Sequence, residues 1–387
     1  MIIYQSVVKE RNNETYLEAQ FQSKEEKKTL WFKIPAEYKA YIVTENQDAA
    51  LVSLLVLAMI NNENIHIKGK VSAKLFYTIN TYLIKAFHLA NKEYHIIRVT
   101  ADSLNYDSLV NTKNAATGLS CGIDSFSTIS THLNLDEEYK IKYFMFLNAG
   151  SHGKYGSGST QKTFLKRLDN IKKYSLSVNI PILQIESNIS EHLNLKFQKL
   201  HSVFQLSCVL VLQKLINIYY YSSAYRFDYF QISKDDTSSW DTLLIQYLQT
   251  ESTGFYSSMA QMTRLERTKL VARYEPTYQF LDVCVNPLIS NKNNCSKCDK
   301  CLRTLISFDL EGLKENYKEV FDFEVYNKHK DKFISSLIFK KEKDQINLEL
   351  LNALKAKNKI RFKHYYIYLI FIFKKRIKKK LRVFISN

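Results

Sequence analysis

Residues 118–128 read GLSCGIDSFST and follow a short apolar stretch. The first five letters match Gly-x-Ser-x-Gly, the strand–turn–helix pattern that presents the nucleophile of a serine hydrolase. The overlapping letters SCGIDS, residues 120–125, are typical of a turn of small residues whose backbone amides bind phosphate together with the next helix N-terminus. The stretch therefore predicts either a covalent serine intermediate or hydrolysis of ATP between its α- and β-phosphates.

The serine hydrolase hypothesis needs partners that the chain does not offer in the required order. Its oxyanion donor comes from an earlier strand–helix loop, but residues 115–119 are the first strand of the α/β pattern. It also needs a histidine in a loop after a late strand. Downstream of Ser120, none of these histidines occupies such a loop: His192, His201, His329 and His364. The sequence therefore favours the phosphate-binding interpretation.

A phosphate-binding turn uses more of these residues. We expect a helix over 124–134 whose N-terminus faces the anion. Ser120 and Ser125 can donate hydroxyl hydrogen bonds, and Asp124 can cap the helix or help to bind Mg²⁺. The lysine of a Walker A loop is missing, which excludes an ordinary P-loop NTPase. Cys121 is either a small residue that the turn tolerates or a low-pKa thiolate at the helix N-terminus.

Hydrophobic periodicity divides the chain into three parts. Residues 1–108 mix alternating strand patterns with two apolar helical patterns, which predicts a separate N-terminal α+β domain. Residues 109–320 alternate strands and helices, which predicts a doubly wound α/β domain with a parallel sheet. Residues 321–387 are predicted to form a basic helical extension. Finer expectations are a long helix over 195–222 and a strand at FDYFQIS, residues 227–233.

Four of the six cysteines cluster as Cys-x10-Cys-x2-Cys-x2-Cys. Zn²⁺ prefers four soft ligands in a tetrahedron, and two-residue spacers let one turn place successive thiolates on one ion. In a reducing compartment this spacing favours a metal over disulfides, with an iron–sulfur cluster as the alternative. A zinc site closed by four cysteines is structural. The predicted ligands are Cys284, Cys295, Cys298 and Cys301.

Ser120–Ser125 resembles the Ser-Gly-Gly-x-Asp-Ser motif of the PP-loop, or N-type ATP pyrophosphatase, family, with Cys121 in place of the first glycine. The cysteine cluster is similar to that of the 7-cyano-7-deazaguanine synthases of that family, in which a Cys-Gly-x-Cys-x-x-Cys run is followed by arginine. Ser296 replaces the glycine of that run, and Arg303 lies one position closer to the last cysteine. The resemblance covers about residues 113–310 and implies a PP-loop (HUP-like) domain with a zinc knuckle.

The resemblance implies that the loop binds the pyrophosphate end of ATP with Mg²⁺, and that a substrate, expected to be a carboxylate, is activated by adenylation. A nitrogen nucleophile would then give an amide, a nitrile or a conjugate. Alternatives are a sugar amidotransferase of surface-polysaccharide synthesis, a tRNA-modifying enzyme and a nucleotide-binding module without catalysis. The implied catalytic residues are Asp124 and Ser125, and the implied nucleotide contacts are these two with Ser120, Cys121, Gly122, Ile123, Ser151 and His152.

Other polar residues follow predicted strands or precede the cysteines, and each also fits a structural role as a cap, a turn or a solvated face. These further candidates are Lys154, Asp235, Asp236, Asp241, Arg264, Arg267 and Lys269.

The formal net charge of +17 predicts an anionic partner without choosing among nucleotide, nucleic acid and membrane. The basic aromatic tail at 353–387 fits a helix docked on the body or an interfacial helix on anionic lipid, ahead of a nucleic-acid contact. The start lacks a signal-peptide pattern, and the apolar runs at 51–60 and 365–373 are too short to span a bilayer. We expect a cytoplasmic protein, peripheral to the inner membrane face if the tail binds lipid. The expected partners are ATP, a small-molecule or conjugated carboxylate and a second copy of the chain.

Overall fold

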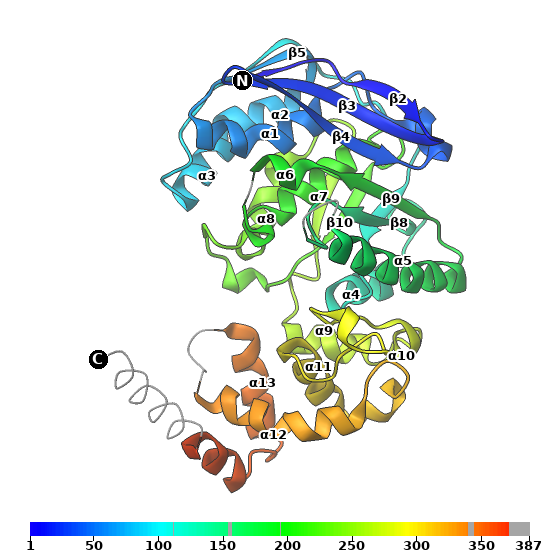
Figure 1. The fold of residues 1–387 in the computed structure, drawn as a ribbon, viewed down its shortest axis with the longest axis vertical. Coiled ribbons are helices and arrows are strands. Elements are labelled where there is room, and N and C mark those ends of the chain that lie inside the picture. Colours follow the sequence, from blue (N-terminus) through cyan, green and yellow to red (C-terminus); the bar gives the residue numbers. More distant parts are fainter. Residues whose placement is uncertain (111, 154–156, 194, 340–343, 371–387) are drawn as a thin grey trace. The chain divides into compact units, whose positions relative to one another are not determined.

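The computed structural model describes residues 1–387 except 111, 154–156, 194, 340–343 and 371–387 (Figure 1). The residues group into two compact units. Unit 1 comprises residues 1–120 and 124–261, and unit 2 comprises residues 121–123 and 262–387.

The described strands of unit 1 belong to an 11-stranded sheet in which most neighbouring pairs are parallel. The strands are β1 (Ile2–Ile3), β2 (Val7–Arg11), β3 (Glu14–Ser23), β4 (Glu26–Ile34), β5 (Ile65–Ser72), β6 (Val99–Asn105), β7 (Ala115–Gly118), β8 (Ile141–Asn148), β9 (Ile182–Ser187), β10 (Ile218–Ser222) and β11 (Gly254–Ser258). Their order is β11-β10-β7-β8-β9-β4-β3-β1-β5-β6, and β2 pairs with β3.

Helices of unit 1 follow the apolar patterns of the sequence. The first is apolar on nearly every side, so it is buried around most of its circumference, as expected for a helix inside a large core. The bounds are α1 (Asp48–Asn61), α2 (Ala73–Thr78), α3 (Ile84–Ala90), α4 (Ile123–His132), α5 (Gly158–Val178), α6 (Ile189–Leu193), α7 (His201–Leu210) and α8 (Asp241–Leu244).

The N-terminal strands continue the same sheet as the later ones. β3 and β4 form an antiparallel hairpin whose alternating apolar residues are buried, as the sequence pattern predicts. β4 then pairs antiparallel with β9 through Phe32↔Ser187 and Lys33↔Glu186. The two compact units are therefore not divided at residues 108 and 320, where the sequence predicts domain boundaries. Those domain boundaries stay a prediction.

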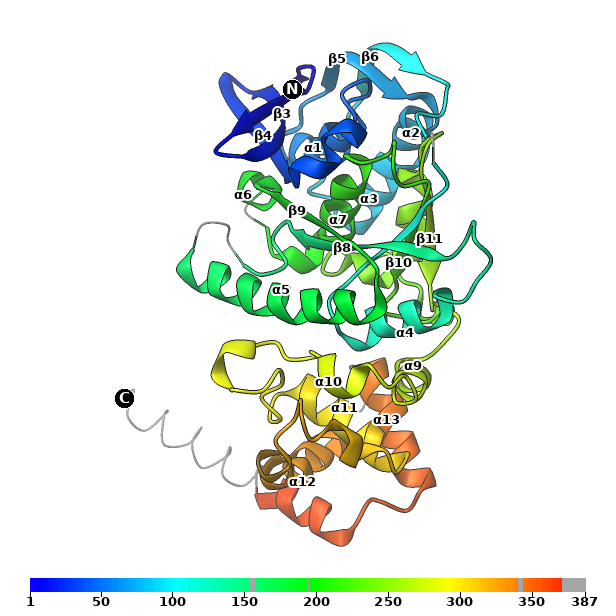
Figure 2. The same cartoon turned by 90° about the vertical axis from the view of Figure 1, so that its right-hand side faces the viewer.

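The five strands from β7 to β11 pair in parallel, in the order β11-β10-β7-β8-β9. Numbered along the chain from β7, this order is 3-2-1-4-5 read from β9, so it reverses between β7 and β10. Figure 2 shows α4 and α5 on one face of these strands and α7 on the other. The expected α/β class with a largely parallel sheet is confirmed.

Two predictions between residues 195 and 233 are wrong. The expected long helix ends as α7 at Leu210, and residues 218–222, IYYYS, form the buried strand β10. The expected strand FDYFQIS instead contains a short 3₁₀ helix, Phe227–Tyr229. A continuous apolar run does not distinguish a buried parallel strand from a buried helix, and this ambiguity produced the first error.

Unit 2 is helical in its described part. Its helices are α9 (Arg264–Val271), α10 (Thr277–Phe280), α11 (Asp299–Leu310), α12 (Phe323–Phe339) and α13 (Gln345–Ala356).

The first part of the basic tail docks on α12. Residues 362–370 are helical, and the buried ring of His364 bonds through Nε2 to Asp331 Oδ1 at 3.1 Å. The Ser335 hydroxyl donates to the His364 carbonyl oxygen. Residues 371–387 lie outside the described residues, as does Lys154. None of the helices in the described part of the chain combines the length and hydropathy needed to cross a bilayer.

Candidate functional site

The SCGIDS segment lies at the carboxyl end of β7, where the strand order reverses. β7 ends at Gly118 and α4 begins at Ile123, so the expected strand–turn–helix is present. Both neighbours of β7, β8 and β10, run parallel to it. In open α/β sheets, ligands bind outside the carboxyl ends of strands at such a switch point. The topology therefore puts residues 119–125 where a ligand site is expected.

Cys121 adopts a left-handed backbone, with φ of 56°. This conformation favours glycine, and a residue with a Cβ is strained there by roughly 1–2 kcal/mol. The thiol is fully buried, and the backbone carbonyl of Cys121 accepts a hydrogen bond from the Asp282 N–H at 2.8 Å. Burial, reinforced by Asp282, raises the pKa of Cys121 well above that of an ordinary thiol. The hypothesis of a reactive thiolate at this position is therefore wrong.

Ser120 and Ser125 close the turn. The Ser120 N–H donates to Ser125 Oγ at 3.4 Å, and the two hydroxyl oxygens lie 3.3 Å apart. These distances are long for hydrogen bonds, so an anion that accepts from the same groups can replace them. Asp124 lies in the first turn of α4, where a carboxylate interacts favourably with the helix dipole.

Ser151 and His152 follow β8 at the same edge of the sheet, and they bond to each other. Ser151 Oγ lies 2.9 Å from the His152 Nδ1 atom and donates to the Leu147 carbonyl at 2.9 Å. The imidazole packs edge-on against Phe146 and Phe164. Burial, with the charge of Arg167, lowers the pKa of His152 to about 3. A neutral ring in this environment stabilises the loop through its contacts. It carries no positive charge with which to attract a phosphate.

The acidic candidates after β10 also have structural partners. Asp236 accepts a hydrogen bond from the Ser238 N–H at 2.9 Å and contacts His201 Nε2 at 3.2 Å. Asp241 is buried and accepts from Ser223 Oγ at 3.0 Å. The structure therefore accounts for these two as cap and core residues, while Asp235 lies in the preceding loop.

The basic candidates of α9 divide by environment. Arg267 is fully buried and donates from its guanidinium to the Met262 carbonyl oxygen. Lys269 forms an ion pair with Glu311 at 3.3 Å. Arg264 lines a cavity of unit 2.

Each histidine that could serve a serine hydrolase bonds to a group away from Ser120. His192 Nε2 contacts the Thr29 carbonyl, His201 contacts Asp236 and Tyr221, His329 contacts the Val325 carbonyl, and His364 contacts Asp331. This removes the sequence-based support for a catalytic triad at Ser120.

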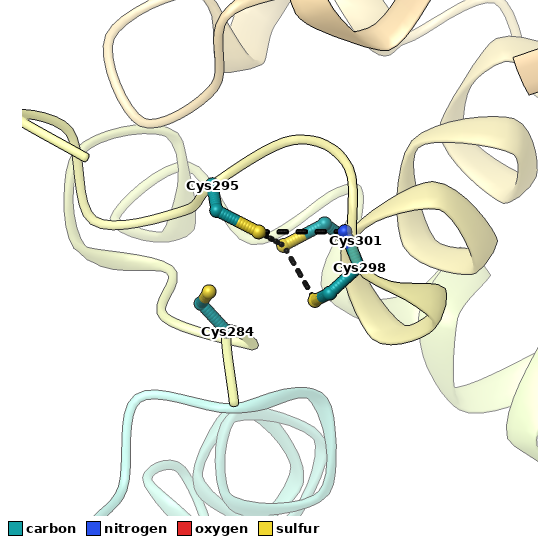
Figure 3. Close-up of side chains that lie close together, drawn as sticks. All are labelled: Cys284, Cys295, Cys298 and Cys301. Carbon is teal, nitrogen blue, oxygen red and sulfur yellow. Dashed lines mark hydrogen bonds between the residues drawn. The ribbon is translucent and has the colours of Figure 1, made fainter. Parts of the chain in front are cut away.

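The four predicted metal ligands come together in unit 2 (Figure 3). Their sulfur atoms all lie within 4.8 Å of one another, with Cys295–Cys301 at 3.9 Å and Cys298–Cys301 at 3.4 Å. Tetrahedral zinc with Zn–S bonds of ~2.3 Å places its sulfur atoms about 3.8 Å apart. The four cysteines could therefore hold a metal such as zinc.

Backbone amides support this donor set. The Asn286 N–H donates to Cys284 Sγ and the Cys298 N–H donates to Cys295 Sγ, both at 3.4 Å. Such N–H···S bonds favour thiolate over thiol, the form that a metal requires. Hydrogen bonding among the cysteines lowers the pKa of Cys298 and raises the pKa of Cys284 and of Cys301, as expected when one thiolate accepts from neighbouring thiols.

Ser296, the residue after Cys295, adopts a left-handed backbone with φ of 56°. Its buried hydroxyl accepts a hydrogen bond from the Asp322 N–H at 2.8 Å. This bond gives a reason for a serine at a backbone conformation that favours glycine.

Sequence reasoning missed Asn294, which braces the cysteine segments. Its buried side chain accepts from the Val283 N–H at 2.8 Å and donates to the Leu281 carbonyl at 2.8 Å. It also donates to the Val320 carbonyl at 3.2 Å. Its position directly before Cys295 was the available signal, since ligand segments need hydrogen-bonding support of this kind.

Comparison of this chain with protein-family models, with curated proteins and with solved structures finds no match.

Proposed function

We propose that the chain is an adenylating enzyme of the PP-loop type, which cleaves ATP to AMP and pyrophosphate to activate a carboxylate. The observation that carries the proposal is the SCGIDS segment at the carboxyl end of β7, where the strand order reverses. Such a switch point is the expected place for a nucleotide, and the turn supplies backbone amides and a helix N-terminus for its phosphates.

A second observation supports the resemblance to this family. The chain departs from the family's pattern by replacing glycine at Cys121 and Ser296, and both residues have a left-handed backbone. These are the conformations that glycine adopts most readily. The two departures in sequence therefore leave the backbone compatible with the family's motifs.

The proposed chemistry requires stabilisation of the negative charge that builds up on the departing pyrophosphate. A carboxylate oxygen attacks the α-phosphorus, the bond from that phosphorus to the bridging oxygen breaks, and pyrophosphate leaves with the electron pair. The loop amides with Ser120 and Ser125 would stabilise this charge. Asp124 lies in the same helical turn and would repel a bare phosphate, so it is best used as a ligand of Mg²⁺. A nitrogen nucleophile then attacks the acyl carbon, AMP leaves, and water takes the nitrogen's proton.

A nucleotide-binding module without catalysis is the second candidate, and Cys121 favours it. The buried thiol fills the turn with a side chain where the family has none. In such a module ATP would bind without turnover.

Product analysis tests the proposal. The chain is incubated with ATP, Mg²⁺ and a panel of carboxylates with ammonia, and nucleotides are separated by chromatography. We expect AMP and pyrophosphate, and a loss of roughly 100-fold or more in Asp124→Asn because a charge-stabilising group is removed. The matched control is Asp136→Asn, an exposed aspartate of unit 1, which should keep its activity. ADP and phosphate as products would overturn the proposal, and binding without turnover across the panel would favour the module.

A further inference from the structure

Among the described residues, a small cavity in unit 2 is lined by three cationic side chains and no acidic one. Arg264 comes from α9, and Lys300 and Arg303 come from α11. The enclosed space is about 20 Å³, which is room for one water molecule or one oxygen atom of a larger group. Together with the space that opens from it to solvent, the cavity measures about 370 Å³.

Helical spacing brings these groups to one place. On α11, Lys300, Arg303, Thr304 and Ser307 are separated by three or four residues and share one face of the helix. Thr268 lies one turn after Arg264 on α9 and also lines the cavity. Hydroxyl groups therefore lie beside the cations, and those of Thr268 and Ser307 donate to the carbonyl oxygens of Arg264 and Arg303.

The electrostatics of the cavity favour an anion. Arg264 and Lys300 lie in the first turns of α9 and α11, where the helix dipole disfavours positive charge. Two carboxylates lie nearby, and each accepts a hydrogen bond from a backbone N–H. Asp344 Oδ1 accepts from the Ile346 N–H while its Oδ2 lies 3.7 Å from Arg303, and Glu349 accepts from the Leu265 N–H. Among the described residues, the lining of the cavity thus carries three cations, with these two carboxylates beside it.

We propose that this cavity binds a phosphoryl oxyanion, with one terminal oxygen in the enclosed space between Arg264, Lys300 and Arg303. Guanidinium groups match phosphate oxygens with two parallel hydrogen bonds, and lysine adds a point charge. Because the enclosed space admits about one oxygen atom, the rest of the anion lies toward solvent. Inorganic phosphate, pyrophosphate and phosphate esters share this chemistry.

The three cations of the site come from α9 and α11 and not from the β7–α4 turn, so the site does not require ATP cleavage. Another lining residue, Ile123, is part of the SCGIDS segment. An anion in the cavity would thus lie against a residue of that segment whether or not the chain hydrolyses ATP.

Isothermal titration of the full chain with inorganic pyrophosphate, without ATP or Mg²⁺, tests the site. Arg303→Gln should weaken binding by about tenfold or more, because it removes a hydrogen-bonded charge. Lys300→Gln should weaken it by roughly threefold, since this lysine is exposed and screened. The control Lys328→Gln makes the same charge change at an exposed lysine of α12, and its affinity should stay at the wild-type value.

Two further arms make the outcome unambiguous. Ser125→Ala separates the cavity from the β7–α4 turn: affinity that is lost in this variant but kept in Lys300→Gln and Arg303→Gln overturns the cavity. Equal affinities in Lys300→Gln, Arg303→Gln and Lys328→Gln would also overturn it. If Arg303→Gln does not fold, Lys300→Glu decides, because reversing this charge should weaken binding by about tenfold, more than neutralising it does. Titration with inorganic phosphate and with acetate distinguishes a phosphoryl site from a carboxylate site, and stronger binding of acetate would contradict the proposal.

Discussion

At the scale of single residues, Cys121 and Ser296 both have a left-handed backbone, but different contacts of their side chains offset the strain. The Ser296 hydroxyl accepts a buried hydrogen bond from the Asp322 N–H, whereas Cys121 contributes a buried thiol. Sequence comparison with the family motif identified both positions as departures. The torsion angles explain them as residues that occupy glycine's usual conformation.

Substitution of Cys121 tests this backbone conformation. Cys121→Gly relieves strain of roughly 1–2 kcal/mol but loses the buried sulfur, so its net effect on stability should be small. Cys121→Val adds a β-branched side chain at positive φ, which is a severe outlier, and should lower the melting temperature by several degrees more than glycine does. Calorimetry on both variants measures the difference. Equal melting temperatures would show that the backbone at residue 121 is not left-handed.

The pKa of His152 predicts an acid-dependent loss of stability. Burial lowers this pKa from 6.5 to about 3, so folding favours the neutral ring. The neutral ring of His152 therefore contributes to the free energy of unfolding above pH 6.5. This contribution is lost as the pH falls from 6.5 toward 3. His152→Phe keeps a ring between Phe146 and Phe164 and removes the titration. The melting temperature of the wild type, relative to this variant, should therefore fall between about pH 7 and pH 4. A constant difference would contradict a buried neutral His152.

At the scale of elements, side chains complete the short ladder between β4 and β9. Only two residue pairs are in register there. Beyond them, Asn188 Oδ1 accepts from the Trp31 N–H and its Nδ2 donates to the Thr29 carbonyl, both at 2.9 Å. The amide of Asn188 thus replaces a further backbone pair. No periodicity in the sequence predicts this contact, since its partners are more than 150 positions apart.

Asn188→Ala should destabilise unit 1. Two hydrogen bonds to backbone groups are lost, which costs about 1–3 kcal/mol of unfolding free energy. Denaturant unfolding followed by tryptophan fluorescence, to which Trp31 and Trp240 contribute, measures this free energy. The control is Asn134→Ala, an exposed asparagine that should change stability little. Similar stability of the two variants would mean that the backbone ladder alone holds β4 on β9.

The cysteine cluster was predictable because its spacing fixes its chemistry. We expect one zinc ion per chain by elemental analysis and a lower melting temperature after treatment with a chelator. Cys298→Ser should lose the metal, whereas Cys208→Ala, a buried cysteine outside the cluster, should keep it even if its packing suffers. Full metal content in Cys298→Ser would remove this residue from the ligand set.

At the scale of the whole molecule, the sequence predicted local elements better than it predicted the pairing of distant strands. The β7–turn–α4 unit and the cysteine cluster follow from local spacing. The shared sheet of residues 1–105 and 115–258 does not, because strand pairing between distant segments leaves no periodic signal. Asn294 was missed although it directly precedes Cys295, because its hydrogen-bond partners Val283 and Leu281 lie 11 and 13 positions away.

The strand order is what links the SCGIDS segment to nucleotide chemistry. The motif alone fits two reaction classes, and the topology gives a physical reason for phosphates at the carboxyl end of β7. The catalytic proposal thus depends on one geometric expectation, that residues 120–125 contact the pyrophosphate end of ATP.

A crystal structure of the chain with Mg²⁺ and α,β-methylene-ATP, which cannot be cleaved between its α- and β-phosphates, tests this expectation most directly. We predict β- and γ-phosphate oxygens within about 2.7–3.2 Å of the backbone amides of residues 121–125, with the Ser120–Ser125 contact opened. Phosphates bound elsewhere, with that contact intact, would contradict the proposed function.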